Sequence, residues 1–189
     1  MKIFSQSAVF LAAVVFLQMT LLCDGREACA MASSNRNREA TPPSLSPEDA
    51  QKMLALHNQV RADVGVGPLR WSEDLAHYAQ QWADHLAATR CGLQHRPRSG
   101  KWRGDFGENL FMGTIGYYGI ADAVKDWAAE KRLYPGGPYR ASWRGVGHYT
   151  QIVWRNTRRV GCATSVCKGN LIVVCNYDPP GNYIGEYPY

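Results

Sequence analysis

Apolar residues recur at helical spacing soon after residue 45. Ser46 can cap a helix that begins at Pro47, and acidic residues follow in its first turn. Glycine and proline at residues 65–68 end the pattern. We therefore predict a first helix with one buried face, formed by Met53, Leu54, Leu56, Val60 and Val64.

The same periodicity predicts two further helices. Ser72 can cap the second, which should reach about Thr89. The third covers residues 120–133, between a glycine-rich turn and the Pro-Gly-Gly-Pro of residues 135–138. The apolar stripes of the two helices contain Leu75, Tyr78, Ala79, Trp82 and Leu86, and Ile120, Val124, Trp127 and Leu133.

The pattern changes in the last third of the chain, where short β-branched and apolar runs are separated by turn residues. These runs predict strands at TQIVW (residues 150–154), GCATSVC (161–167) and NLIVVCNY (170–177). Helices followed by late antiparallel strands are typical of the α+β fold class rather than of alternating βαβ units.

The N-terminal part differs in composition. Lys2 precedes a largely apolar run at residues 8–22, which is typical of a signal peptide and short for a membrane span. We expect a signal peptide at residues 1–30, a flexible arm rich in Ser, Asn, Arg and Pro at residues 31–47, and one domain at residues 48–189. The protein should therefore be secreted and extracellular, without a transmembrane segment.

Cysteine count and charge agree with that compartment. Removing Cys23 and Cys29 with the signal peptide leaves an even number of cysteines, as oxidising compartments favour. The net charge of +5 is modest, and much of the positive charge lies in the basic runs at residues 96–103 and 155–159. Neither run belongs to a recognisable nucleic-acid module, so solvated loops are favoured and no nucleic-acid partner is expected.

Four titratable residues stand at the ends of elements or beside glycine, where polar groups can converge on a cleft: His95, Glu108, Glu130 and His148. Their spacing does not decide between convergence and four separate surface positions. No serine lies in a nucleophile elbow, and the cysteines fit no nucleophile motif. A glycosidase that uses Glu108 and Glu130 as its two carboxylates is chemically possible.

The motifs GENL, GHYTQIVW, GCA and CNYDPPGNYIGEYPY carry a resemblance to a known family. The chain resembles class one plant pathogenesis-related proteins of the CAP superfamily (cysteine-rich secretory, antigen five and pathogenesis-related proteins) from about residue 50 to residue 189. The resemblance implies a three-layer α-β-α sandwich around a central antiparallel sheet. It also implies one cleft that contains His95, Glu108, Glu130 and His148.

The family resemblance implies binding more than catalysis. No cofactor is required, although His95 and His148 could hold a divalent metal such as zinc. Sterol or another lipid is the implied ligand, with a lining from the loop after Glu130. That lining consists of Leu133, Tyr134, Tyr139 and Trp143. The alternative is a metal-dependent hydrolase, a protease or glycosidase, that uses the four cleft residues.

The resemblance also implies a defence role outside the plant cell, in the apoplast, against fungi and oomycetes. In relatives a C-terminal peptide is released as a defence signal, which here would mean cleavage between Asp178 and Pro179 and release of residues 179–189. Its partners would then be a pathogen surface or a receptor for the peptide. We expect the protein to be a monomer.

Two cysteines usual in the family are missing here. Val146 stands at one position and Arg140 lies near the other. We therefore expect Cys167 to pair with Cys175 across a hairpin. Cys91 and Cys162 would then be free or joined to each other.

Overall fold

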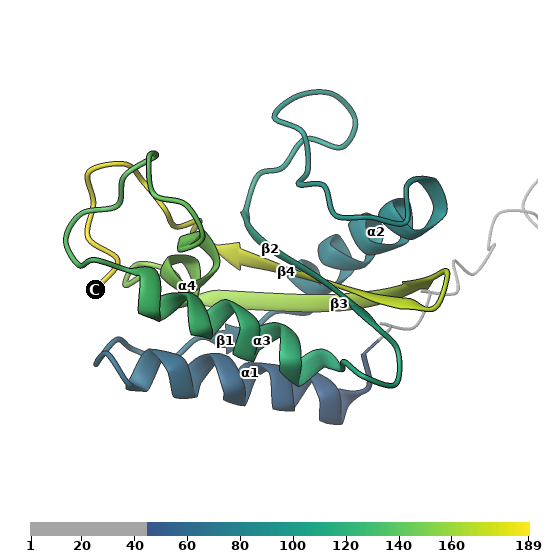
Figure 1. Cartoon of the computed structure of the whole chain (residues 1–189), viewed down its shortest axis with the longest axis horizontal. Helices are drawn as coiled ribbons and strands as arrows, with labels where there is room; N and C mark the ends of the chain where they lie inside the picture. Colours follow the sequence, from purple (N-terminus) through teal and green to yellow (C-terminus); the bar gives the residue numbers. More distant parts are fainter. Residues whose placement is uncertain (1–44) are drawn as a thin grey trace, which may run out of the picture. The chain divides into compact units, whose positions relative to one another are not determined.

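The computed structural model describes residues 45–189 (Figure 1). The predicted signal peptide at residues 1–30 lies outside this range, as does nearly all of the predicted arm. Among the described residues no helix has the length and apolar character needed to cross a membrane.

The elements follow one another as two helices with a short strand between them, a first long strand, three helical segments and a final hairpin. They are α1 (Pro47–Ala62), β1 (Arg70–Trp71), α2 (Glu73–Thr89), β2 (Gly107–Thr114), α3 (Ile120–Ala129), the 3-10 helix η1 (Glu130–Leu133), α4 (Gly147–Ile152), β3 (Arg159–Cys167) and β4 (Asn170–Asp178). The predicted starts of α1 and α2 are confirmed, because Ser46 Oγ accepts from the Asp49 amide at 3.1 Å and Ser72 Oγ from the Leu75 amide at 3.4 Å.

The sheet has the strand order β1-β3-β4-β2. Its three long strands pair antiparallel, as expected, whereas the two-residue β1 pairs parallel to β3 and makes the sheet mixed. In Figure 1, α1 and α3 lie side by side on one face and α2 covers the other. The α+β class and the three layers are thus confirmed.

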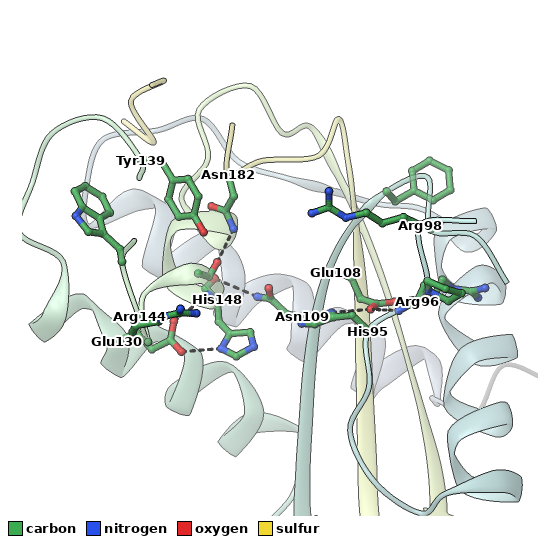
Figure 2. A pocket seen from close by; sticks show the side chains of 16 residues that line it. His95, Arg96, Arg98, Glu108, Asn109, Glu130, Tyr139, Arg144, His148 and Asn182 are labelled. Carbon is green, nitrogen blue, oxygen red and sulfur yellow. Dashed lines mark hydrogen bonds and ion pairs between the residues drawn. The ribbon is translucent and has the colours of Figure 1, made fainter. Parts of the chain in front are cut away.

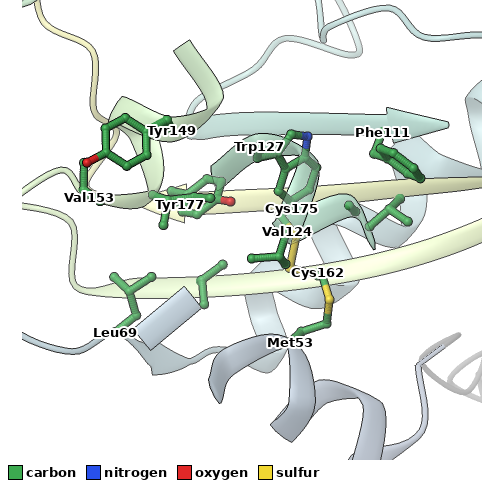
Figure 3. Packing of buried hydrophobic residues seen from close by; sticks show 14 of the residues in the cluster. Met53, Leu69, Phe111, Val124, Trp127, Tyr149, Val153, Cys162, Cys175 and Tyr177 are labelled. Carbon is green, nitrogen blue, oxygen red and sulfur yellow. A yellow bond between two sulfur atoms is a disulfide. The ribbon is translucent and has the colours of Figure 1, made fainter. Parts of the chain in front are cut away.

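The central strand β4 is buried on both faces, which explains its continuous apolar sequence. Val173, Cys175 and Tyr177 pack against α1, α3 and α4 (Figure 3). Ile172 and Val174 point the other way and pack against α2. The alternation of successive side chains places one core on each side of the sheet.

One prediction about the elements is wrong, and one strand was missed. TQIVW forms no strand, because its first three residues complete α4 and the rest follow that helix. Residues 149–154 are all buried, including the polar Thr150 and Gln151, so no exposed polar face marks a helical period. The strand β2 was not predicted at all.

The disulfides also differ from the expected pairs. The structure joins Cys91 to Cys167 and Cys162 to Cys175. The hairpin register places Cys162 opposite Cys175, whereas Cys167 is opposite Asn170 at the turn. Since Cys167 is five positions after Cys162, an odd number, their side chains point to opposite faces of the sheet. Cys167 therefore meets Cys91, which follows α2 on that face.

A buried arginine connects α1 to the segment after α4. Arg61 donates to the carbonyls of Ile152 at 2.8 Å and Trp154 at 2.9 Å from Nη1, and to that of Thr157 at 3.2 Å from Nη2. A fourth hydrogen bond runs from Nε to the Gly67 carbonyl at 2.7 Å. Burial lowers the pKa of Arg61 to about 10, so it remains charged at neutral pH.

Candidate functional site: a cleft with two His–Glu pairs

A cleft of about 480 Å³ opens at one end of the sheet. It contains all four predicted residues, so the structure brings His95, Glu108, Glu130 and His148 together (Figure 2). Glu108 comes from β2, Glu130 from the start of η1, and His148 from the first turn of α4. His95 lies in the loop between α2 and β2. The four residues form two pairs on opposite sides of the cleft.

In the first pair, Glu130 holds the N-terminus of α4. Its Oε1 lies 2.7 Å from His148 Nδ1, and its Oε2 accepts from the amides of His148 at 2.9 Å and Tyr149 at 3.1 Å. Val146, which precedes α4, provides no side-chain cap, so Glu130 supplies the cap from another element. Burial alone would raise the pKa of Glu130, but the hydrogen bonds and the attraction to His148 together lower it.

In the second pair a glutamate again binds both a histidine ring and a backbone amide, here on the loop between α2 and β2. Glu108 Oε1 lies 2.8 Å from His95 Nδ1 and accepts from the Arg96 amide at 3.0 Å. The Arg96 side chain is buried, with its Nε 3.9 Å from Glu108 Oε2 and its guanidinium 3.8 Å from the centre of the Tyr78 ring. The exposed fraction is 62% for the His95 side chain and 7% for that of Glu108. An open imidazole is thus held by a buried carboxylate.

Both pairs fix the same ring nitrogen. A carboxylate oxygen can only accept, so each Nδ1 carries the hydrogen and donates it. In the neutral ring, Nε2 is then left as an acceptor or a metal ligand. The ring of His148 also stacks on Trp127, with centroids 6.0 Å apart and planes at 27°. The geometry therefore presents two oriented imidazoles to the cleft.

Sequence reasoning missed Asn109, which connects the cleft to the core. Its Nδ2 donates to the His148 carbonyl and to Tyr177 Oη, each at 3.1 Å. Tyr177 Oη in turn lies 2.9 Å from Nε2 of the buried His57. Burial lowers the pKa of His57 to about 4, so its ring is neutral and accepts from Tyr177. His57 is therefore a buried structural residue.

The structure does not assemble a closed metal site in the cleft. Among residues 45–189, the group of three or more potential ligands whose atoms lie within 4.8 Å of one another is His57, Cys162 and Cys175. Its two cysteines form a disulfide and offer no thiolate.

The loop predicted to bind lipid divides into two parts. Tyr139 and Trp143 line the cleft, and their ring centroids are 6.0 Å apart. Tyr134 packs inward against Tyr149 and the C-terminal Tyr189. Leu133 is 54% exposed and does not line the cleft. The structure brings only half of this predicted set to the site.

The C-terminal segment supports the other wall of the cleft. Asn182 lines the cleft, and its Nδ2 donates to the Gly147 carbonyl at 2.9 Å. The Tyr139 amide donates to the Glu186 carbonyl at 2.8 Å, and the Gly185 amide donates to the Tyr139 carbonyl at 2.9 Å. In the sequence, the only indication of this contact was that GNY (residues 181–183) follows closely on the last strand.

Comparison with known proteins identifies relatives. A family model described as the cysteine-rich secretory protein family, CAP, matches residues 54–177. Pathogenesis-related protein 1A of Nicotiana tabacum is 48% identical over 141 residues, which cover 74% of this chain and 80% of that protein. Pathogenesis-related protein 1 of Arabidopsis thaliana is 45% identical over 150 residues, covering 78% and 86%.

Solved structures agree with this assignment of the fold. NaASP2, crystallised with Zn²⁺, aligns with a TM-score of 0.67 at 28% identity over 78% of this chain and 88% of that one. MpPR-1i aligns with a TM-score of 0.53 at 28% identity over 74% and 93%.

The Glu130 cap leads to a pH-dependent prediction. We expect Glu130→Gln to lower the free energy of unfolding at neutral pH by about 1 kcal/mol, because the amides of α4 lose an anionic acceptor. Folding lowers the pKa of Glu130 below its ordinary value of 4.5. The stabilisation is therefore present above pH 4.5 and disappears as the pH falls through the lower, folded pKa.

Urea unfolding of both proteins between neutral and acidic pH measures this difference. The exposed Glu186 makes no side-chain hydrogen bond or ion pair within residues 45–189, so Glu186→Gln is the control. A stability difference that stays constant from neutral pH to below the folded pKa would show that the Glu130 charge does not hold α4.

Proposed function

Because the chain belongs to the cysteine-rich secretory protein family, CAP, we propose that it is an extracellular plant defence protein that acts by binding ligands in its cleft. The defence role is supported by its identity to plant pathogenesis-related proteins over most of its length. Secretion into the apoplast is supported by two disulfides, which persist in oxidising compartments. Antifungal and anti-oomycete action are the expected outcomes of such binding.

One observation favours binding over hydrolysis: both cleft carboxylates are already engaged. Glu130 accepts three hydrogen bonds and Glu108 accepts two. A general base needs a pKa near the working pH, whereas the pKa of Glu130 is lowered. Glu108 Oε2 accepts no hydrogen bond within residues 45–189, but it is buried and lies 3.9 Å from the Nε of Arg96. Of the residues that the structure describes, no serine or cysteine lines the cleft. The carboxylates therefore orient the histidines rather than attack a substrate.

We propose that His95 and His148 together hold a divalent cation such as zinc through their Nε2 atoms. The support is the carboxylate behind each ring, an arrangement that fixes metal-binding histidines elsewhere. A cation there would supply a Lewis acid that attracts an anionic or carbonyl oxygen of a ligand. Protein groups would leave coordination positions open for that oxygen.

For the metal, we expect His148→Ala to weaken zinc binding by at least about tenfold, because one of two ligands is lost. The exposed His77 on α2 lies outside the cleft, so His77→Ala should leave zinc binding unchanged. Isothermal titration with zinc measures both. Equal affinity of His148→Ala and the unmodified chain would refute the site. Zinc-dependent turnover of a peptide or glycan that His148→Ala abolishes would instead support the hydrolase alternative.

We further propose that a sterol or another lipid binds along the aromatic wall formed by Tyr139 and Trp143. Both side chains are half-buried, which leaves apolar ring surface at the cleft mouth. Tyr134 supports Trp143 from behind, with ring centroids 5.5 Å apart. A sterol needs such an apolar surface next to a polar end, and the floor of the cleft supplies polar groups.

For the lipid, Trp143→Ala should weaken sterol binding about tenfold through lost apolar contact. Tyr117 is 85% exposed and lies outside the cleft, so Tyr117→Ala is the matched aromatic control. Equilibrium binding of a radiolabelled sterol with EDTA present measures the effect without metal. An equal loss in both variants, or none in Trp143→Ala, would assign sterol elsewhere.

Release of residues 179–189 after Asp178 is proposed as a second output, directed to a receptor or to the pathogen surface. Much of the segment is accessible, because Ile184 is 72% and Tyr187 54% exposed. Its removal would break the hydrogen bonds to Tyr139 and the one from the Arg155 amide to the Pro188 carbonyl. Mass spectrometry of secreted fluid for PPGNYIGEYPY checks it, and absence of the peptide from induced tissue would reject release.

A further inference from the structure

We propose that the cleft binds an acidic oligosaccharide, and that Arg98 and Arg144 pair with its carboxylates. This ligand class goes beyond the metal and the sterol and requires neither. The charge pairing uses two cleft arginines to which the His–Glu pairs give no role.

Two unpaired guanidinium groups face the cleft. Arg98 and Arg144 are exposed and line it, and within residues 45–189 neither makes a hydrogen bond or an ion pair. By contrast, the cleft's third arginine, Arg96, is buried beside Glu108. Figure 2 shows Arg98 extending over the cleft from the side of Glu108, whereas Arg144 lies beside Glu130. The two free cations thus stand on opposite walls.

No free anion balances them. The only carboxylates that line the cleft among the described residues are Glu108 and Glu130. Each is committed to a histidine and to backbone amides. The unpaired charge that a ligand meets is therefore positive. A guanidinium pairs with a carboxylate through two parallel hydrogen bonds, so the ligand should carry carboxylates that reach both walls.

The remaining lining indicates a sugar between those carboxylates. With each Nδ1 hydrogen donated to a glutamate, Nε2 of His95 and of His148 can accept from hydroxyl groups. Tyr139 and Trp143 offer flat apolar faces beside these acceptors. A uronic-acid ring has a matching set of groups, because it combines an apolar C–H face, hydroxyl donors and a carboxylate.

The spacing of the charges argues against a nucleic acid. A nucleic-acid strand needs a groove of cations that follows a continuous phosphate backbone. Here two isolated guanidiniums stand apart, which suits one carboxylate per sugar ring. An acidic peptide shares the carboxylates but not the hydroxyls and ring faces, and it serves as a comparison ligand.

The test is isothermal titration of the full chain with a short oligogalacturonide at low salt, with EDTA present. We expect binding that falls about tenfold in Arg98→Gln and again about tenfold in Arg144→Gln, because each loses a charge-assisted pair. Arg140→Gln removes the same charge from the same loop outside the cleft, and should change affinity by less than about twofold.

Two ligand controls separate charge from sugar recognition. The fully methyl-esterified oligosaccharide keeps the rings without the charges and should bind at least about tenfold more weakly. Polyglutamate should bind more weakly than the oligogalacturonide and should not respond to Trp143→Ala. Equal binding of the esterified sugar or of polyglutamate, an equal loss in Arg140→Gln, or no binding of oligogalacturonide would each overturn the proposal. EDTA makes these outcomes independent of the zinc site.

Discussion

The short helix α4 is held at both ends by charged side chains from other elements, and the cleft depends on this arrangement. The Glu130 carboxylate binds the amides at its N-terminus, and the Arg61 guanidinium binds the Ile152 and Trp154 carbonyls at and beyond its C-terminus. A helix of six residues cannot persist through its own hydrogen bonds. The negative charge lies at the N-terminus and the positive charge at the C-terminus, so both are favourable to the helix dipole and stabilise α4 in its place beside the sheet and α3.

Holding α4 also orients the site. The carboxylate that caps the helix is the one that fixes Nδ1 of His148, so fold and function share Glu130. Asn109 adds a second restraint at the His148 carbonyl. On the other side, Glu108 does the same for His95 with a backbone amide of the loop. The cleft therefore presents two prearranged imidazoles between walls that carry aromatic rings and free arginines, a design suited to binding.

Much of the fold could be predicted from the sequence where one face of an element is buried and the other is exposed to solvent. The caps at Ser46 and Ser72 are local signals, and they placed α1 and α2 correctly. The segment of α4 could not be predicted, because residues 149–154 are buried on every side and keep no period. The disulfides failed for a related reason: the faces on which Cys162 and Cys167 lie follow from strand register, which spacing in the sequence does not reveal.

The four cleft residues were found through motifs rather than through spacing, since their convergence depends on three elements and a loop that are far apart in the chain. Asn109, Asn182 and the two free arginines were missed. Each becomes meaningful only when β2, the C-terminal segment and two loops meet around one cavity. The local sequence does not show that these segments lie around one cavity.

The most direct test of the account is amide hydrogen exchange of Arg61→Met, compared with Arg70→Met at an exposed position. If Arg61 holds α4, protection of the α4 amides should fall by at least about tenfold while that of β3 and β4 is retained. The imidazole resonances of His148 should shift as the helix loosens. Unchanged protection of α4 in Arg61→Met would contradict the claim that charged side chains at its two ends hold this helix and its histidine in place.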